Sequence, residues 1–218
     1  MKSVDLIEFK QLQAEGCLVI DARPSEIFCD GFVDESLSVP FNENFVAALQ
    51  ELVEDGQRVL IVADEKEIVP VAKALNYSGS AEVAGVLAGG FETWSANEKK
   101  FDMLITIDID EFIIDYNFDE FFLIDVRTAE EFEQEHVEDS QNIALNDLEQ
   151  LLIDLETSDN YYLYANTFSE AVTAGSIFKR NGFERVRVVM ADYEALKKSK
   201  LPFFKKKKEK PDSKFSNN

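Results

Sequence analysis

Thiol chemistry is the first kind that the residue types allow, because the chain has two cysteines, Cys17 and Cys29, and one histidine, His136. A cysteine attacks as its thiolate, which needs surroundings that lower the thiol pKa. Cys17 follows the expected end of a helix and Cys29 falls on a short helix, so we predict two inert, partly buried thiols. Two cysteines do not make a disulfide scaffold, and with one histidine they do not suit a dedicated zinc site. No metal and no cofactor is expected.

Opposite charges two residues apart occur twice. Asp21 and Arg23 follow one apolar segment, and Asp125 and Arg127 follow another. We predict a structural ion pair in each case, because removing one partner would leave the other charge partly desolvated. Each pair is expected to brace its strand against the neighbouring loop. The sequence contains no Gly-rich phosphate loop, no hydrolase elbow and no metalloprotease motif.

These pairs belong to an internal repeat. Residues 18–28 match residues 122–132 at an offset of 104, and the apolar segment 59–63 corresponds to 161–165 at an offset of 102. A period near 100 residues indicates a duplicated domain. We predict one domain over residues 1–98, a second over 101–200, and a basic tail over 201–218.

Each copy is expected to alternate strands with helices. In the first copy, strands are predicted at residues 18–21, 37–39, 59–62 and 82–86, with helices between them. Ser3 is expected to cap the first helix. Such alternation is typical of an α/β domain in which a parallel sheet of four or five strands carries helices on both faces.

The repeated motifs resemble those of a known family. Asp125-Val126-Arg127, followed by Glu131-Phe132 and Glu135-His136-Val137, is similar to the first signature of rhodanese-like domains. The segment Gly89-Gly90-Phe91-Glu92-Thr93-Trp94 resembles the Gly-Gly-x-x-x-Trp turn that closes such a domain. The resemblance implies two consecutive domains of the sulfurtransferase fold. It also implies that His136 forms a hydrogen bond within the fold.

Active members of this family move sulfur through a cysteine that follows a buried strand and begins a loop of inward-pointing amides. Those amides lower the thiol pKa and hold the anionic donor. Here the nucleophile positions are Ala63 and Ala165, and the loop arginine is replaced by Ile68 and Glu170. We therefore predict that neither copy is catalytic. As remnants of binding loops we take the polar residues Asp64, Lys66, Asn166, Thr167, Ser169 and Glu170.

Charge is distributed unevenly along the chain. The formal net charge is −21, but nine lysines from Lys197 onward face only Glu209 and Asp212, a net of +7. The remaining 13 basic and 41 acidic side chains give residues 1–196 a net charge of −28. Such a body repels phosphate backbones, which excludes nucleic-acid binding by the folded part. We expect the tail over 201–218 to be disordered. It either serves only solubility, or its lysines, Lys205–Lys208 among them, contact an anionic surface or fold back on the acidic body.

The location is expected to be cytoplasmic. No segment approaches 18 consecutive apolar residues, so no membrane span is predicted. Acidic residues near the N-terminus interrupt the apolar run that a signal peptide needs. The low cysteine content suits a reducing compartment.

Three functional hypotheses follow. In the first, this is a catalytically inactive tandem protein that acts as a binding or regulatory module for an unknown protein partner. The alternative is a thiosulfate or persulfide sulfurtransferase, or a thiol relay, that uses Cys29 or Cys17. A third hypothesis is a structural subunit tethered through its basic tail. The alanines at both nucleophile positions favour the first.

Overall fold

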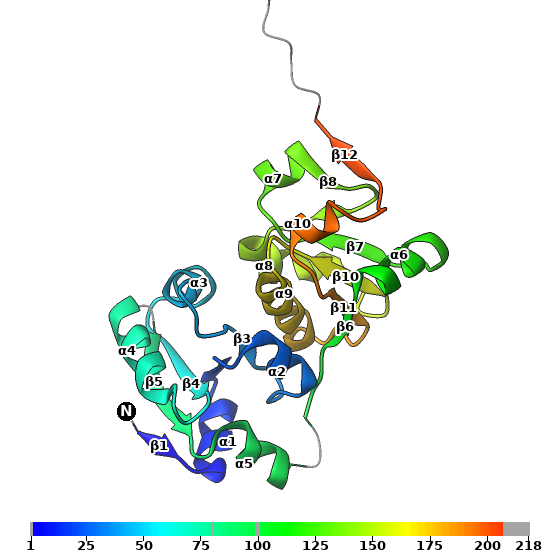
Figure 1. Ribbon diagram of the computed structural model, residues 1–218. Coiled ribbons are helices and arrows are strands. Elements are labelled where there is room, and N and C mark those ends of the chain that lie inside the picture. Colours follow the sequence, from blue (N-terminus) through cyan, green and yellow to red (C-terminus); the bar gives the residue numbers. More distant parts are fainter. Residues whose placement is uncertain (1, 80, 99–100, 207–218) are drawn as a thin grey trace, which may run out of the picture.

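The computed structural model describes residues 2–79, 81–98 and 101–206, which contain two sheets of five strands each (Figure 1). The first has the order β1-β5-β4-β2-β3 and the second β6-β11-β10-β7-β9, so the two sheets are equivalent strand for strand. Neighbouring strands are parallel in both, which confirms the predicted α/β architecture. The strands are β1 (Ser3–Val4), β2 (Leu18–Asp21), β3 (Leu37–Ser38), β4 (Gln57–Val62), β5 (Ala81–Leu87), β6 (Ile105–Ile107), β7 (Phe122–Asp125), β9 (Gln141–Asn142), β10 (Tyr161–Tyr164) and β11 (Val186–Val189).

Helices cover both faces of each sheet because alternate strand residues point to opposite sides. In β4, Val59 and Ile61 belong to the cluster with α3 and α4, whereas Leu60 and Val62 belong to the cluster with α1 and α5. The first domain contains α1 (Leu6–Ala14), α2 (Ser25–Asp30), α3 (Phe45–Leu52), α4 (Ile68–Ser78) and α5 (Gly90–Asn97). The second contains α6 (Ile109–Phe118), α7 (Ala129–Gln134), η1 (Leu145–Asp147), α8 (Leu148–Leu151), η2 (Leu152–Asp154), α9 (Phe168–Arg180) and α10 (Tyr193–Leu196).

The N-cap of the first helix lies two residues later than predicted. Asp5, not Ser3, is its N-cap, and the Asp5 carboxylate accepts a hydrogen bond from the Glu8 amide at 2.9 Å. Ser3 lies in β1, opposite Val86 of β5. Pairing at the edge of the sheet extends the backbone at Ser3, so the cap falls to the acidic residue directly before the helix.

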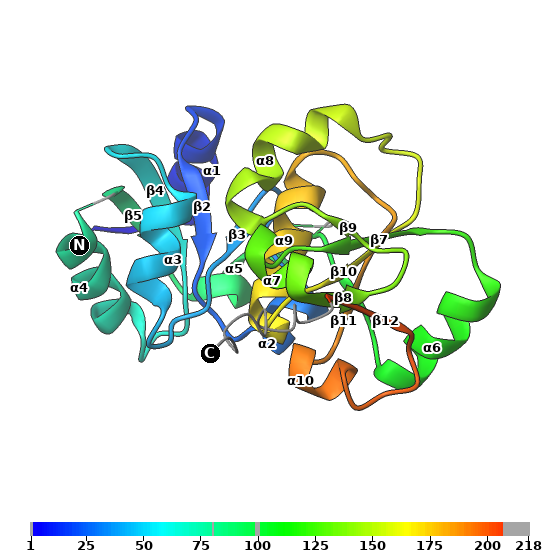
Figure 2. The ribbon, with the colours of Figure 1, turned by 90° about the horizontal axis from the view of Figure 1, so that it is seen from above.

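The two domains share one core. A single hydrophobic cluster takes in residues of α2, α3 and α4 from the first domain and of α8 and α9 from the second. Helix α9 lies between the two sheets in both views (Figures 1 and 2), against β10 and β11 on one side and α2 and β3 on the other. Its residues 171–178 are all buried. Gly175 permits this packing, because a Cβ there would lie 2.6 Å from Leu104 Cδ2.

Hydroxyl groups of α9 also form hydrogen bonds with backbone groups of β3, the edge strand of the first sheet. The amide of Ser38, in edge strand β3, donates to Ser176 Oγ at 3.0 Å, and Thr173 Oγ1 donates to the Ser38 carbonyl at 2.9 Å. The hydroxyls of Ser25 and Ser169 are 3.0 Å apart nearby. An edge strand normally leaves such backbone groups to solvent. Here the second domain covers the edge, which couples the two domains.

The chain beyond residue 200 differs in part from the predicted disordered tail. Residues 203–205 form β12 (Phe203–Lys205), which pairs antiparallel with β8 (Glu135–Val137). The Phe204 ring stacks on His136 with centroids 4.8 Å apart, and Lys205 Nζ lies 2.6 Å from Glu135 Oε1. Ring stacking and charge neutralisation give this lysine-rich segment an anchor. Lys207 and Lys208 lie outside the described residues.

No helix in the described ranges has the length and apolar character needed to cross a lipid bilayer.

Candidate functional site

Both predicted ion pairs are present, with almost the same geometry. Arg127 Nη2 lies 2.6 Å from Asp125 Oδ2 and donates to the Glu135 carbonyl at 2.8 Å. Arg23 Nη2 lies 2.5 Å from Asp21 Oδ2 and likewise donates to a backbone carbonyl eight residues later. In each pair the arginine also donates through Nε to the aspartate. Each pair therefore ties the end of the first long strand to the segment after the following helix.

An aromatic ring covers each of these arginines. The Arg127 guanidinium carbon lies 3.5 Å from the centroid of Tyr193, and that of Arg23 lies 4.2 Å from the centroid of Phe91. Phe91 and Tyr193 are each one of the first residues of the last helix in their domain. The Gly89-Gly90-Phe91 turn of the first domain therefore corresponds to Ala191-Asp192-Tyr193 of the second.

The loop after β10, residues 165–170, is named the second loop. It begins at Ala165, which is buried, and its backbone turns into α9 through a capping box. The Thr167 amide donates to Glu170 Oε2 at 3.1 Å, and the Glu170 amide donates to Thr167 Oγ1 at 3.2 Å. The Phe168 amide donates to Asp192 Oδ1 at 3.0 Å. Side-chain oxygens of the chain itself thus occupy these three amides at the start of the helix.

Two carboxylates near this loop differ in their affinity for protons. Burial would raise the pKa of Glu131, but hydrogen bonds from Thr128 and Asn166 and the charge of Arg127 outweigh burial and lower this pKa. Burial raises the pKa of Glu170, backbone hydrogen bonds offset this only in part, and the charge of Glu131 raises it further. The surroundings therefore favour the ionised form of Glu131, whereas they make ionisation of Glu170 unfavourable relative to a carboxylate in water.

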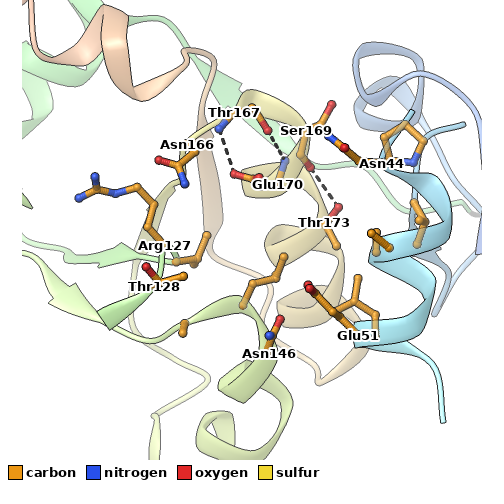
Figure 3. A pocket seen from close by; sticks show the side chains of 18 of the residues that line it. Asn44, Glu51, Arg127, Thr128, Asn146, Asn166, Thr167, Ser169, Glu170 and Thr173 are labelled. Atoms are coloured by element: carbon orange, nitrogen blue, oxygen red, sulfur yellow. Dashed lines mark hydrogen bonds between the residues drawn. The ribbon is translucent and has the colours of Figure 1, made fainter. Parts of the chain in front are cut away.

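A cavity of about 440 Å³ lies between this loop and α3 of the first domain, and we name it the interdomain cleft. Figure 3 shows Asn44 and Glu51 on the α3 side and Asn166, Thr167 and Glu170 on the opposite side. The volume falls within the range of ligand-binding cavities. Its lining includes Asn44, Phe45, Ala48, Glu51 and Leu52 from the first domain and Val126, Arg127, Thr128, Glu131, Leu145, Asn146, Asn166, Thr167, Ser169, Glu170 and Thr173 from the second.

The corresponding loop of the first domain, residues 63–67, does not contribute to this cleft. Ala63 is buried at the end of β4, Asp64 is half-buried and Lys66 is exposed. The Glu67 amide donates to the Asp64 carbonyl at 2.8 Å, which closes a tight turn. Of the polar loop residues predicted for binding, only those of the second domain therefore line the interdomain cleft, whereas Asp64 and Lys66 line a separate shallow pocket.

The cysteines and the histidine do not line the cleft. Cys17 and Cys29 are both free and buried. Burial, with the charges of Asp30 and Glu26, raises the pKa of Cys29 to about 12, and burial also raises the pKa of Cys17. His136 Nδ1 donates to the Phe132 carbonyl at 2.6 Å, which is the hydrogen bond within the fold that the family resemblance implied. In the described part of the chain, no three His, Cys, Asp or Glu side chains are placed to hold a metal ion.

Sequence reasoning missed half of the cleft. It did not find the α3 wall, because helix contacts between domains leave no motif. Outside the cleft lining, it also missed Asp192, which accepts from the Phe168 amide, and Tyr193, which covers Arg127, although a signal for both exists in the repeat. Aligning Gly89-Gly90-Phe91 with residues 191–193 at an offset of 102 shows that an acidic residue stands where the first domain has Gly90.

Comparison with known proteins agrees with this fold. The sequence matches the rhodanese-like domain family twice, over residues 5–97 and 108–199. The chain therefore belongs to the rhodanese-like domain family, with two domains in tandem. No individual curated protein matches it at a significant level.

Solved structures similar to this chain include single rhodanese-like domains and a longer protein. The rhodanese-like domain of an Anabaena protein is 18% identical, with a TM-score of 0.44, over 53% of this chain and 97% of that one. Thiosulfate sulfurtransferase from Pseudomonas aeruginosa is 20% identical, with a TM-score of 0.42, over 94% of this chain and 41% of that one. The family assignment depends on the two sequence matches and the fold, not on these superpositions.

Proposed function

We propose that this protein binds a protein partner at the interdomain cleft and does not transfer sulfur. The observation that carries this proposal is the second loop. Ala165 stands at the nucleophile position there, and two backbone amides at the start of α9 donate hydrogen bonds to carboxylates of the chain itself. Glu170 accepts from Thr167, and Asp192 accepts from Phe168. A persulfide or thiosulfate needs those same amides, and negative charge beside it opposes its binding.

The first domain supports the same proposal independently. Its loop begins with Ala63 and continues with Asp64 and Glu65, and in the described part of the chain this loop does not line the interdomain cleft. An alanine side chain has no atom that could accept sulfur from a donor. The interdomain cleft, in contrast, is lined by residues of both domains, and binding a ligand there does not require a thiol.

The competing function is sulfur transfer through Cys29 or Cys17. Both thiols are buried, and the pKa of Cys29 stands near 12, so at neutral pH it is a thiol and not a thiolate. Sulfur transfer requires the thiolate at the surface of a donor site. These properties favour binding over relay chemistry.

The test is an activity assay with a covalent readout. Purified protein is incubated with thiosulfate and cyanide, or with mercaptopyruvate and a thiol acceptor, from pH 5 to pH 9, and intact mass is recorded in parallel. We expect no turnover and no added sulfur. A persulfide on Cys29 or Cys17 that cyanide removes would refute the proposal and establish a sulfurtransferase.

A further inference from the structure

Of the three acidic side chains that line the interdomain cleft among the described residues, Glu131 is stabilised by Arg127, but Glu51 and Glu170 have no such cation. Arg127 is the one basic residue among the described residues that line it. Its guanidinium is bound by Asp125 and the Glu135 carbonyl, is stacked on Tyr193, and points away from α3 (Figure 3). Within the described ranges, neither Glu51 nor Glu170 forms an ion pair. Two carboxylates thus face the cleft without a counter-charge.

Apolar side chains form part of the cleft wall, beside polar residues such as Asn146 and Thr173. Helix α3 contributes Phe45, Ala48 and Leu52, and the second domain contributes Val126 and Leu145. A ligand that fits both features has a hydrocarbon stem for the apolar wall and a positive head for the carboxylates. The lysine side chain combines a four-carbon stem with an ammonium group in this way.

The amides that would favour an anion are already in use. Thr167 and Phe168 donate to carboxylates of the chain itself, so the positive end of α9 is covered by negative charge. The mutual repulsion of Glu131 and Glu170 remains in the free protein, and a bound cation would relieve it. The cleft therefore has the opposite charge preference from a site for a sulfur anion.

We propose that the interdomain cleft binds an alkylammonium group, presented by a lysine side chain of a partner protein. This inference rests on the proposed binding function and names the chemistry of its ligand. Binding places the ammonium group between Glu170 on α9 and Glu51 on α3, with the stem along Phe45 and Leu52. Because the carboxylates come from different domains, recognition requires the tandem arrangement.

The test uses an end-blocked Gly-Lys-Gly peptide and the same peptide with its lysine Nζ acetylated, each titrated into the full chain by calorimetry. We expect the acetylated peptide to bind at least about tenfold more weakly, since tenfold corresponds to 1.4 kcal/mol. Glu170→Gln keeps an oxygen for the Thr167 amide while removing the charge, and Glu51→Gln removes the other charge. Each should weaken binding of the lysine peptide by about three- to tenfold. Glu54→Gln, an exposed acid just after α3 that does not line the cleft, should leave binding unchanged.

The same titration distinguishes this inference from others. Equal binding of the two peptides, equal weakening by Glu54→Gln, or no binding at millimolar peptide would overturn it. If a free diamine such as 1,5-diaminopentane binds and the lysine peptide does not, the ligand is a small-molecule amine and the proposed protein partner is wrong. None of these results restores sulfur transfer, which the activity assay measures separately, so the two proposals fail independently.

Discussion

Removing two hydroxyl groups of α9 should weaken both domains together. Ser176→Ala leaves the amide of Ser38, which has no exposed surface, without an acceptor. An unsatisfied buried donor costs about 1–3 kcal/mol. Thr173→Val keeps the shape of the side chain but removes its bond to the Ser38 carbonyl, at a cost of about 1 kcal/mol. The double variant should therefore lose about 2–4 kcal/mol of unfolding free energy, less if the two sites couple.

Urea unfolding followed by two probes measures this. Trp94 is the only tryptophan and lies buried in the first domain, so its fluorescence reports that domain alone. Far-ultraviolet circular dichroism reports the helices of both. We expect coincident transitions in the wild type and in the double variant, with a lower midpoint in the latter. Ser95→Ala is the control, because that hydroxyl bonds only within its own helix, and its effect should stay within about 0.5 kcal/mol.

The reasoning would be refuted by separate midpoints for the two probes in the wild type. That outcome would mean that the domains unfold independently in spite of their shared core. It would also be refuted if the double variant changed the dichroism transition and left the Trp94 transition in place. In either case the hydroxyls of α9 would not couple the two domains.

Further variants test the loops and the backbone. Glu35 has a left-handed backbone with φ of 63°, so Glu35→Gly should raise the free energy of unfolding by about 1 kcal/mol. Asp139 has the same backbone conformation, but Asp139→Gly should gain less because it also removes the hydrogen bond that Asp139 accepts from Tyr116. Ala165→Cys alone should not give thiosulfate sulfurtransferase activity, because the carboxylate of Glu170 raises the thiol pKa; turnover by this single variant would contradict this, and addition of Glu170→Arg is the fairer test of the loop. Glu170→Gln should be more stable than the wild type at neutral pH, since the raised pKa of Glu170 means that ionisation costs folded-state stability. That difference should shrink as the pH falls through the raised pKa, and a difference that grows toward acid pH in paired urea titrations would show that Glu170 stabilises as an anion.

Much of the architecture was determined by the sequence alone. The repeat predicted two equivalent domains because each copy carries the same apolar segments at the same spacing, and a strand buried on both faces needs apolar residues throughout. The pairs Asp21–Arg23 and Asp125–Arg127 were readable for a similar reason. Their partners are two residues apart, so local geometry brings them together whatever the rest of the chain does.

The site was decided only by the tertiary structure. Glu51 and Glu170 face one cleft, and Ser38 meets Ser176 and Thr173, although these residues lie more than 100 positions apart in the sequence. Polar residues of this kind have no periodicity that separates an exposed hydroxyl from one that joins two domains. Strand β12 was missed because a lysine-rich sequence is typical of a solvated tail. It is ordered here through contacts with residues distant in the sequence, the His136 ring and the Glu135 carboxylate. What the sequence could not supply is the docking of one domain on the other. That docking depends on how the faces of α3 and α9 pack, and packing is a property of shapes in space, not of residue order.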